Sequence, residues 1–353
     1  MPVPRFSILL PTKNRSIIVG DAIRSVLEQT HHDWELVVSD NDDSNTATRD
    51  VVAGFQDPRI RYFRTSGKLA MHENWESAFQ NSTGTHVLVL EDKQRLNRNA
   101  LEILDRVLTA QPDAVITYPV VLTQEDIPPL LPRDLTPIRM SATELLDRYC
   151  DFDEESWQYL PRGLNSVAPS ALLRDLQRTS PTGHVFSHLA PDHSQAYQVL
   201  SRVDGVLHLP GSVIYIPLSL GKKGTFSNGL SCLRKDETAH RWFSQLPVST
   251  EDLIRDVPIQ THWMPVNIVL HDFRKFLRRP GYTPRYNWVR YHSLALYMVL
   301  LGRWLGCDMT PELTATAASL RRQSSWFCLR VGIDLVRRVT LAVFRKLQGD
   351  RRL

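Results

Sequence analysis

The chain has 353 residues, of which 42% are hydrophobic and 23% charged, enough for a buried core and for two domains or one large one. This composition excludes a chain that is disordered throughout or collagen-like. The net charge of the chain is +4. Residues 319–353 contain nine Lys and Arg but only two Asp, so this tail carries a net charge of +7 and the first 318 residues carry −3. The body is therefore not basic enough to predict nucleic-acid binding.

The cysteines and the N-terminus indicate a compartment. Four cysteines, Cys150, Cys232, Cys307 and Cys328, form neither a CxxC pair nor another metal-ligand spacing. They are too few for a disulfide framework, which favours a reducing cytosol. The N-terminal apolar run is too short for a secretory signal, and no stretch approaches ~18 uninterrupted apolar residues. We expect a cytoplasmic protein without a clear transmembrane helix.

Short apolar runs alternate with segments of helical spacing through the first 118 residues. The apolar runs predict buried strands at Phe6–Leu10, Trp34–Ser39, Ile60–Phe63, Thr85–Leu90 and Ala114–Tyr118. The segments between them predict helices at Gly20–Gln29, Thr46–Phe55, Met71–Asn81 and Asn97–Gln111. This alternation is typical of βαβ units, so the sequence predicts an α/β fold with a mostly parallel sheet flanked by helices.

Polar clusters follow three of these strands, at Pro11–Arg15, Asp40–Asp43 and Glu91–Lys93. In open parallel sheets, ligands bind outside the carboxyl ends of the strands. We therefore expect all three clusters to line one crevice.

The pattern weakens after Tyr118. Prolines between Pro128 and Pro137 indicate an irregular crossing. The spacing then predicts helices at Ala142–Tyr149 and Pro191–Ser201, a strand at Val213–Pro217, a loop at Gly221–Gly229 and mainly helices from about residue 250. We expect three regions, with bounds 1–125, 126–248 and 249–353.

Three segments of the first half resemble family 2 glycosyltransferases of the GT-A fold. They are FSILLPTKNR (6–15), DAIRSVLEQTHHDWELVVSDNDDS (21–44) and NWESAFQNSTGTHVLVLED (74–92), in the family's order. The close likeness covers about residues 5–110. It implies a GT-A, Rossmann-like domain, here with an α-helical C-terminal extension, that transfers a sugar from a nucleoside diphosphate with inversion.

The resemblance also implies which residues bind the donor. Asp40 matches the acid that receives the nucleobase, and a carboxylate that accepts from a uracil N3–H would select a UDP-sugar. The alternative is that Asp40 only caps the next turn. Asp42 and Asp43 are interpreted as solvated turn residues, and Lys13 stands where the family often has an aromatic. The further donor-binding candidates are Pro11, Thr12, Asn14, Arg15, Lys68, Glu91, Lys222 and Lys223.

Glu91 and Asp92 fall at the family's metal-binding motif. Hard oxygens there would hold Mn²⁺ or Mg²⁺ against the leaving diphosphate. Lys93 occupies the third place of the motif, where matching members usually have a further acid. Three interpretations stay open: Glu91 and Asp92 hold a metal, Lys93 partly replaces the cation, or the site is inactive.

An inverting transfer needs a base for the acceptor hydroxyl. Asp192, after Pro191 at the start of a predicted helix, is our candidate, although an acid there is also an ordinary cap. Asp153, Glu154 and Glu155 are alternatives. His188 and His193 are interpreted as structural.

Two loops carry lysines that would meet a diphosphate. Lys222 and Lys223 lie between glycines in a segment that would close over the donor, and Lys68 precedes the Asn-Trp helix. The alternative in both cases is a solvated surface lysine.

The C-terminal segment Trp326–Leu347 has apolar residues at helical spacing, with arginines elsewhere on the helix. A basic amphipathic helix can lie on an anionic membrane, and we expect peripheral contact of 326–348 with the inner face of the membrane. It can equally pack on its own domain or on a partner.

Together these observations predict a metal-assisted glycosyltransferase that uses a nucleotide-sugar, most simply a UDP-sugar, and a glycan or lipid-linked acceptor. Such a chain would serve polysaccharide biosynthesis at the cell envelope, with no nucleic-acid partner. The alternative is a non-catalytic GT-A protein that binds a nucleotide or glycan as the partner of another enzyme. A nucleotidyltransferase is disfavoured, because no Gly-rich basic loop follows the first strand.

Overall fold

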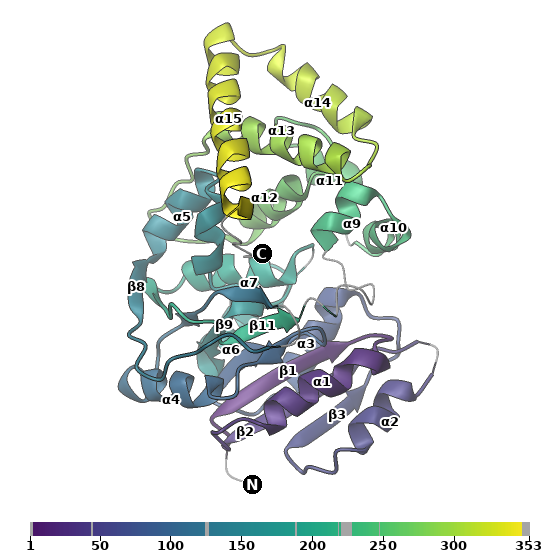
Figure 1. Cartoon of the computed structure of the whole chain (residues 1–353), viewed down its shortest axis with the longest axis vertical. Coiled ribbons are helices and arrows are strands. Elements are labelled where there is room, and N and C mark those ends of the chain that lie inside the picture. The colour runs from purple at the N-terminus through teal and green to yellow at the C-terminus, as the bar shows by residue number, and fades with distance from the viewer. Residues whose placement is uncertain are drawn as a thin grey trace.

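The computed structural model describes residues 3–43, 45–123, 127–187, 189–217, 219, 228–246 and 248–347 (Figure 1). Its main sheet has eight strands in the order β3-β2-β1-β4-β9-β6-β10-β8. Their bounds are β1 (Phe6–Thr12), β2 (Trp34–Asp40), β3 (Ile60–Arg64), β4 (His86–Val89), β6 (Ile116–Thr117), β8 (Ile138–Ser141), β9 (Ser166–Pro169) and β10 (Gly205–His208). Six strands run in one direction, while β9 and β8 run against them, so the predicted mostly parallel sheet is confirmed.

A second, three-stranded sheet has the order β5-β11-β7. Its strands are β5 (Arg95–Leu96), β7 (Val120–Thr123) and β11 (Ile214–Pro217). Strand β11 was expected from the sequence, whereas the two-residue β5 is too short to leave a periodic pattern.

Helices cover both faces of the main sheet. The helices of the first 200 residues are α1 (Ser16–Leu27), α2 (Ala47–Ala53), α3 (Met71–Gln80), α4 (Ala100–Ala110), α5 (Ala142–Cys150), α6 (Ser170–Thr179) and α7 (Pro191–Leu200), with short 3-10 helices η1 (Glu154–Tyr159) and η2 (Gly163–Asn165). Alternate side chains of β1 and β2 enter two buried clusters. Leu9 and Val37 pack with α3, α5 and α7, and Ile8 and Val38 pack with α1 and α4.

The predicted elements of the first half are confirmed, with shifted ends. Strand β1 continues through Pro11, which was expected to end it. The proline is tolerated because its missing N–H would face β4, and the pairing of β1 with β4 stops at Leu9. Helix α1 begins four residues before the predicted Gly20.

The second half is helical beyond residue 228 in the part that the structure describes. Its helices are α9 (Asn228–Arg234), α10 (Glu237–Ser244), α11 (Thr250–Ile254), α12 (Pro265–Phe276), α13 (Trp288–Trp304), α14 (Thr310–Leu320) and α15 (Ser325–Leu347). Helix α9 begins inside the segment that we expected to be a loop as far as Gly229. One buried cluster runs from Leu9 to Met309, so α12 and α13 share a core with the sheet. The region bounds at 125 and 248 stay predictions.

A buried carboxylate fastens the starts of three strands. Glu35, at the start of β2, accepts hydrogen bonds from Ser7 Oγ of β1 (2.6 Å) and from the backbone N–H groups of Thr83 and Gly84 before β4 (2.5 and 3.2 Å). Arg61 of β3 completes the cluster at 2.6 Å. A Cβ on Gly84 would stand 2.8 Å from the Ser7 backbone nitrogen, so only glycine allows β4 to begin this close to β1.

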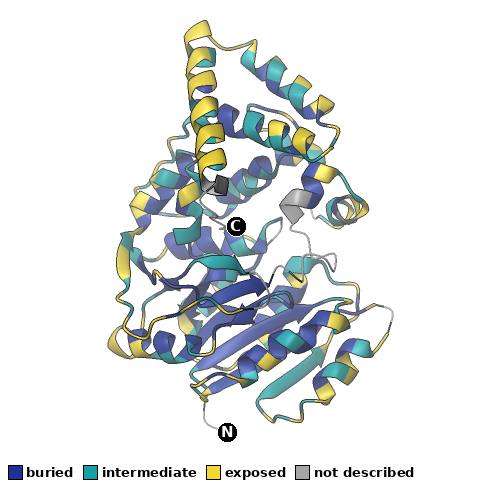
Figure 2. Ribbon diagram, in the orientation of Figure 1, coloured by how far each residue is buried: buried dark blue, intermediate teal, exposed yellow. Residues whose placement is uncertain are grey.

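None of the helices that the structure describes is both long enough and apolar enough to cross a bilayer. Helix α15 instead lies along the edge of the helical region, with much of its surface exposed (Figure 2).

We expect Glu35→Gln to destabilise the fold by about 1–3 kcal/mol at pH 7, because it removes a charged acceptor of several hydrogen bonds. Burial raises the pKa of Glu35, but hydrogen bonds from Ser7, Arg61 and Thr83 outweigh this effect and lower the pKa overall. The native stability gained from this lowered pKa is present above the unfolded pKa of about 4.3 and is lost as the pH falls through the folded value.

Urea unfolding of both proteins between pH 7 and pH 3.5 measures the effect. The difference in unfolding free energy between the unsubstituted protein and Glu35→Gln should narrow as the pH falls, because only the unsubstituted protein loses the Glu35 charge. A difference of constant size would contradict the role of that charge.

Candidate active site

The three polar clusters meet at the carboxyl ends of β1, β2 and β4, as predicted. Thr12, the last residue of β1, donates its hydroxyl to Asp92 Oδ2 at 2.9 Å. The backbone N–H of Asn41, directly after β2, donates to the Thr12 carbonyl at 3.0 Å. One residue of β1 therefore links the other two clusters.

The turn after β1 depends on the backbone of Asn14. Its φ of 55° lies in the left-handed region, which asparagine tolerates better than most residues. This conformation directs the Asn14 N–H onto the Asp42 carboxylate, and the Asn14 amide donates to Asp43 at 3.0 Å. Asp43 is exposed as expected, but Asp42 is buried, which corrects its interpretation as a solvated residue.

Lys13 lies in this turn, and Lys68 lies in the loop after β3. The Lys13 ammonium donates to the Gly67 carbonyl at 2.9 Å and stands 3.6 Å from Asp43 Oδ2, so it ties the β1 turn to the loop after β3. Lys68 follows in that loop and is exposed. A Cβ on Gly67 would stand 2.7 Å from the Asp42 carbonyl oxygen, and its φ of 74° also demands glycine.

Asp40 is fully buried and is bonded within the chain. Its Oδ1 accepts from the Asp42 N–H at 2.9 Å, and its Oδ2 accepts from the Tyr62 hydroxyl at 2.5 Å. Arg64 stands 3.8 Å away. Burial, and next the charge of Asp42, raise the pKa of Asp40 against the lowering effect of these donors. Its role toward a nucleobase stays a prediction.

Tyr62 was not expected from the sequence. Burial and the neighbouring Asp40 raise the pKa of the Tyr62 phenol to about 12. The β2–β3 register pairs Val38 with Tyr62 and Asp40 with Arg64. That register, which a sequence does not reveal, is what brings the phenol to the carboxylate.

Asn74 of α3 forms hydrogen bonds at the ends of β1 and β2. Its amide donates to the Thr12 carbonyl at 3.1 Å and accepts from the Ser39 hydroxyl at 2.7 Å, so α3 is bonded to both β1 and β2. The next residue, Trp75, packs on Phe186 and lies against Gly163. The Asn-Trp pair was noted in the sequence, but its bridging role was not.

The acidic pair after β4 faces two cations of the chain itself. Asp92, whose side chain is 8% exposed, accepts from Arg15 at 3.1 Å as well as from Thr12. Glu91 Oε2 stands 3.2 Å from the Lys93 ammonium, and both side chains are largely buried. The described residues contain no group of three or more His, Cys, Asp or Glu that would hold a metal ion.

As they stand, Glu91 and Asp92 do not fit a divalent cation. Each carboxylate already has an adjacent positive charge, and Asp92 has both oxygens in hydrogen bonds. The predicted Mn²⁺ or Mg²⁺ would have to replace Arg15 and Lys93 at these oxygens.

Asp192 lies in the first turn of α7, as predicted, with its side chain 14% exposed. Its Oδ2 is 3.8 Å from Arg162 and 4.0 Å from His193. Burial lowers the pKa of His193 to about 4, so this imidazole is neutral at pH 7, and its Nδ1 forms a hydrogen bond with the Tyr197 hydroxyl at 3.1 Å. Its structural interpretation is consistent with this burial.

The segment before Asp192 is held by α12. Asp272, itself fully buried, accepts the Ala190 N–H at 2.9 Å. Of the alternative bases, Glu154 pairs with Arg338 of α15 at 2.7 Å, and Asp153 faces Arg290 of α13 at 4.0 Å. Both acids are therefore engaged by the C-terminal helices. Lys222, Lys223 and His188 lie outside the described residues.

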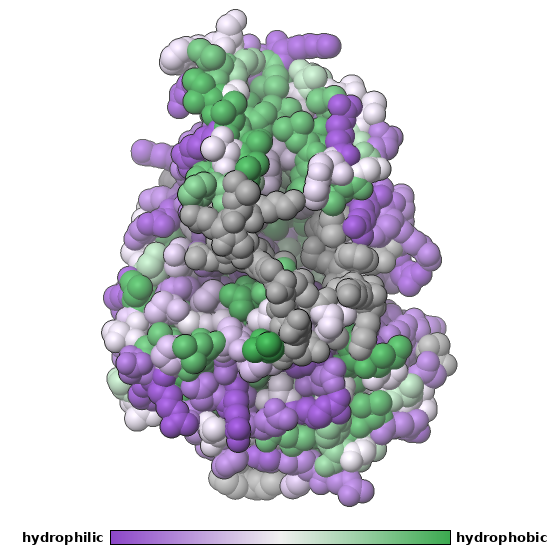
Figure 3. Space-filling view, in the orientation of Figure 1, coloured by the Kyte–Doolittle hydropathy of each residue, from purple (hydrophilic) through white to green (hydrophobic). Residues whose placement is uncertain are grey.

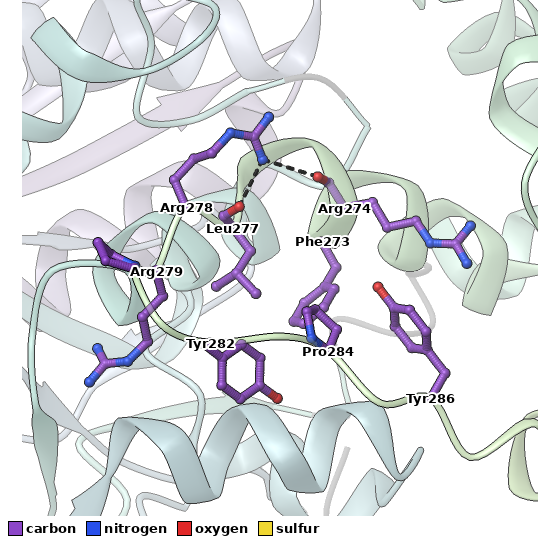
Figure 4. Close-up of a pocket in the computed structure, with 9 residues that line it drawn as sticks. Phe273, Arg274, Leu277, Arg278, Arg279, Tyr282, Pro284 and Tyr286 are labelled. Atoms are coloured by element: carbon purple, nitrogen blue, oxygen red, sulfur yellow. Dashed lines mark hydrogen bonds between the residues drawn. The ribbon is translucent and has the colours of Figure 1, made fainter.

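A separate pocket of about 500 Å³ lies at the C-terminal end of α12 (Figure 4). Its lining contains none of the predicted site residues and includes Arg274, Arg278 and Arg279 with Tyr282 and Tyr286. Arg278 donates to the carbonyls of Leu277 and Arg274 (2.7 and 3.2 Å), and Arg279 donates to two carbonyls at the end of α7.

We expect Tyr62→Phe to destabilise the fold by about 1–3 kcal/mol at pH 7, because it removes a donor from a fully buried carboxylate. The pKa of Asp40 is already raised, so its charge costs stability as the pH rises above the unfolded value of about 3.9. Loss of the Tyr62 donor should raise this pKa further.

The cost of Tyr62→Phe should therefore grow as the pH rises from 4 to 7, as measured by urea unfolding at each pH. A cost that does not change with pH would show that the hydroxyl does not act on the ionised carboxylate.

Comparison with known proteins relates the first half of the chain to a protein family. The model of a family described as "Glycosyl transferase family 2" matches residues 7–168. A GalNAc(5)-diNAcBac-PP-undecaprenol beta-1,3-glucosyltransferase of Campylobacter jejuni is 34% identical over 105 residues, which are 29% of this chain and 34% of that protein. The Escherichia coli UDP-Glc:alpha-D-GlcNAc-diphosphoundecaprenol beta-1,3-glucosyltransferase WfgD is 32% identical over 97 residues, 28% of this chain and 38% of that protein.

A putative teichuronic acid biosynthesis glycosyltransferase of Bacillus subtilis, TuaG, is 29% identical over 103 residues, 28% of this chain and 40% of that protein. These alignments span only 34–40% of each relative's length. Among solved structures, Staphylococcus aureus TarS 1-349 in complex with UDP is 14% identical, with a TM-score of 0.49, over 91% of this chain and 93% of that one.

Proposed function

Because residues 7–168 form a domain of glycosyl transferase family 2, with the GT-A type of sheet and helices, we propose that this chain transfers a sugar from a UDP-sugar to a glycan or lipid-linked acceptor. The observation that carries the proposal is the meeting of three strand-end clusters at Thr12, with Asp92 bonded there. Ligands of parallel sheets bind at such an edge.

The first half offers the groups that a nucleoside diphosphate needs. Arg15 follows the β1 turn and stands before α1, whose N-terminal N–H groups favour an anion. Lys93 and Arg15 lie on the two sides of the acidic pair, and Lys68 is exposed in the loop beyond the turn. Pro11, Thr12 and Asn14 shape this turn, and Asp40 is our candidate for the base.

The donor class is proposed as UDP. The uracil contact of Asp40 requires its carboxylate to exchange the Tyr62 donor for the base, because both of its oxygens are engaged within the chain. The name of the Escherichia coli relative, which includes UDP-Glc, supports a UDP-sugar. Contacts from Lys222 and Lys223 stay part of the proposal.

In the second half, Asp192 is proposed to take the proton of the acceptor hydroxyl in an inverting transfer. Asp192 lies in the first turn of α7, and a carboxylate is a group that can accept a hydroxyl proton. Arg162, 3.8 Å away, and the Asp272–Ala190 hydrogen bond hold the carboxylate in place.

The acceptor is proposed to be a glycan on a diphosphate lipid, for cell-envelope polysaccharide biosynthesis. Two relatives are named for diphosphoundecaprenol-linked acceptors, which supports this class. Such an acceptor is anchored in a bilayer, so the protein would work at the inner membrane face.

The outward face of α15 supports contact with that surface. Trp326, Leu329, Ile333, Val336 and Phe344 are each more than half exposed, on one side of a 23-residue helix. Figure 3 shows apolar side chains gathered in the region of this helix. Arg330 and Arg337 are exposed beside the apolar side chains, and their charges complement anionic lipid headgroups.

The inward side of α15 combines apolar contacts, from Val331 and Phe327, with an ionic cluster. Arg338 is 9% exposed and bonds Asp334 and Glu154 at 2.9 and 2.7 Å. These inward contacts occupy one side of the helix, and a second set of apolar side chains is left exposed on the other side.

We expect Asp192→Asn to lower sugar transfer by about 10²–10³-fold with little change in donor affinity, because a general base contributes about that much. UDP release from a panel of UDP-sugars, with and without a diphosphate-lipid acceptor, measures the rate. Calorimetry with UDP measures the affinity.

The matched control is Asp175→Asn, since Asp175 is a half-exposed acid of α6 outside the site. Undiminished transfer by Asp192→Asn would contradict its role as base. No UDP release by the native chain with any UDP-sugar would favour the non-catalytic alternative.

We expect the chain to float with vesicles that contain a quarter anionic lipid and to bind neutral vesicles more weakly. Ile333→Glu with Val336→Glu should abolish flotation, because both side chains are exposed and their replacement leaves the core intact. Arg330→Ala with Arg337→Ala should weaken binding to anionic vesicles about 10–30-fold, at ~1 kcal/mol for each charge.

Ile138→Glu, at an exposed position on β8, is the control and should bind as the native chain does. Light scattering distinguishes the other occupant of this face. A dimer that the Glu substitutions dissociate, without vesicle binding by the native chain, would contradict membrane contact.

A further inference from the structure

We propose that Lys93 and Arg15 take the place of a divalent cation in this chain, which therefore binds its nucleotide donor without metal. The inference rests on the proposed function, because it concerns the diphosphate of that donor. It departs from the metal that the acidic motif first suggested.

The position of Lys93 is fixed by a tight turn. The Gln94 N–H donates to the Glu91 carbonyl at 2.8 Å, and the Gln94 side chain accepts the Glu91 N–H at 2.9 Å. The turn places the Lys93 ammonium 3.2 Å from Glu91 Oε2. The Lys93 side chain is only 16% exposed, so it is not a solvated surface lysine.

Glu91 depends on this lysine for its charge balance. Its Oε2 is buried and accepts no hydrogen bond of good geometry from any residue that the structure describes. The nearby ammonium is thus the positive charge that offsets it. A divalent cation brought to this carboxylate would stand beside the Lys93 ammonium, which repels it.

Arg15 is the positive charge beside Asp92, as Lys93 is beside Glu91. One terminal nitrogen of its guanidinium donates to Asp92 Oδ1 at 3.1 Å, while the side chain is 36% exposed. A guanidinium has five N–H donors in a planar fork, and this geometry suits the bidentate binding of phosphate oxygens. Arg15 can therefore keep its bond to Asp92 and offer its remaining donors to a diphosphate.

The charges of the four side chains balance without a metal. Glu91 and Asp92 bring two negative charges, and Lys93 and Arg15 bring two positive ones, at 3.2 and 3.1 Å. A divalent cation bound to the same oxygens would stand beside an ammonium and a guanidinium, which repel it. The leaving diphosphate would instead meet the two cations that are already in place.

The decisive experiment is calorimetric titration of the full chain with UDP, once in EDTA and once in Mn²⁺, with GDP and dTDP alongside. We expect the UDP dissociation constant to differ by less than twofold between the two conditions. Tightening by tenfold or more in Mn²⁺ would overturn the inference but leave the proposed function standing. No binding of any of these nucleotides in either condition would contradict the proposed function itself, and the inference with it.

Substitution of Lys93 tests the same point in both directions. Lys93→Ala should weaken UDP binding in EDTA at least tenfold. Lys93→Asp should weaken it in EDTA as well, but should create a third acid, so that Mn²⁺ restores binding. Titration with Mn²⁺ alone should show binding to Lys93→Asp and none to the native chain.

Arg98→Ala is the matched control, since Arg98 is an exposed cation of the same segment, and its UDP binding should equal that of the native chain. Far-UV circular dichroism checks the fold of each variant. If Lys93→Ala does not fold, Lys93→Gln replaces it, and the EDTA and Mn²⁺ titrations of the native chain decide the question alone. Unchanged UDP affinity in a folded Lys93 variant would overturn the role of the lysine.

Discussion

The register of β1 between β2 and β4 is the constraint on which the candidate site depends. Thr12 of β1 pairs with Asp40 of β2, and Leu9 of β1 pairs with Val89 of β4. Asp92 lies three residues beyond Val89, as Thr12 lies three beyond Leu9, so the two reach the same level and bond at 2.9 Å. A slip of one residue would separate these groups and also move the alternate side chains of β1 between the two cores.

This register is secured at the opposite end of the same strands. Glu35 binds the starts of β1 and β4 together, and Gly84 permits their close approach. Neither residue touches the candidate site. They act on it only through the register of β1 and β2, which are buried along their whole length.

The charge pattern at the strand ends changes how the acidic motif is understood. The two carboxylates are not a vacant pair of ligands, because Arg15 and Lys93 adjoin them in a largely buried setting. Away from this site, α15 also holds a largely buried ion pair, Arg338 with Asp334, while a row of its apolar side chains is exposed. Paired charges thus occur both at the proposed donor site and on the inner side of the proposed membrane helix.

The sequence by itself determined the order of strands and helices in the first half and the convergence of three polar clusters, since both follow from local periodicity and from the geometry of parallel sheets. It also found Asp192 at a helix start. Only the tertiary structure decided which polar groups meet: Tyr62 with Asp40, Arg15 with Asp92, and Arg338 with Glu154. These partners are separated by 22, 77 and 184 positions in the chain, and no local pattern records such pairings. The periodicity of α15 likewise predicted a helix with an apolar side, but only its contacts with the rest of the fold show that Trp326, Ile333 and Val336 are exposed.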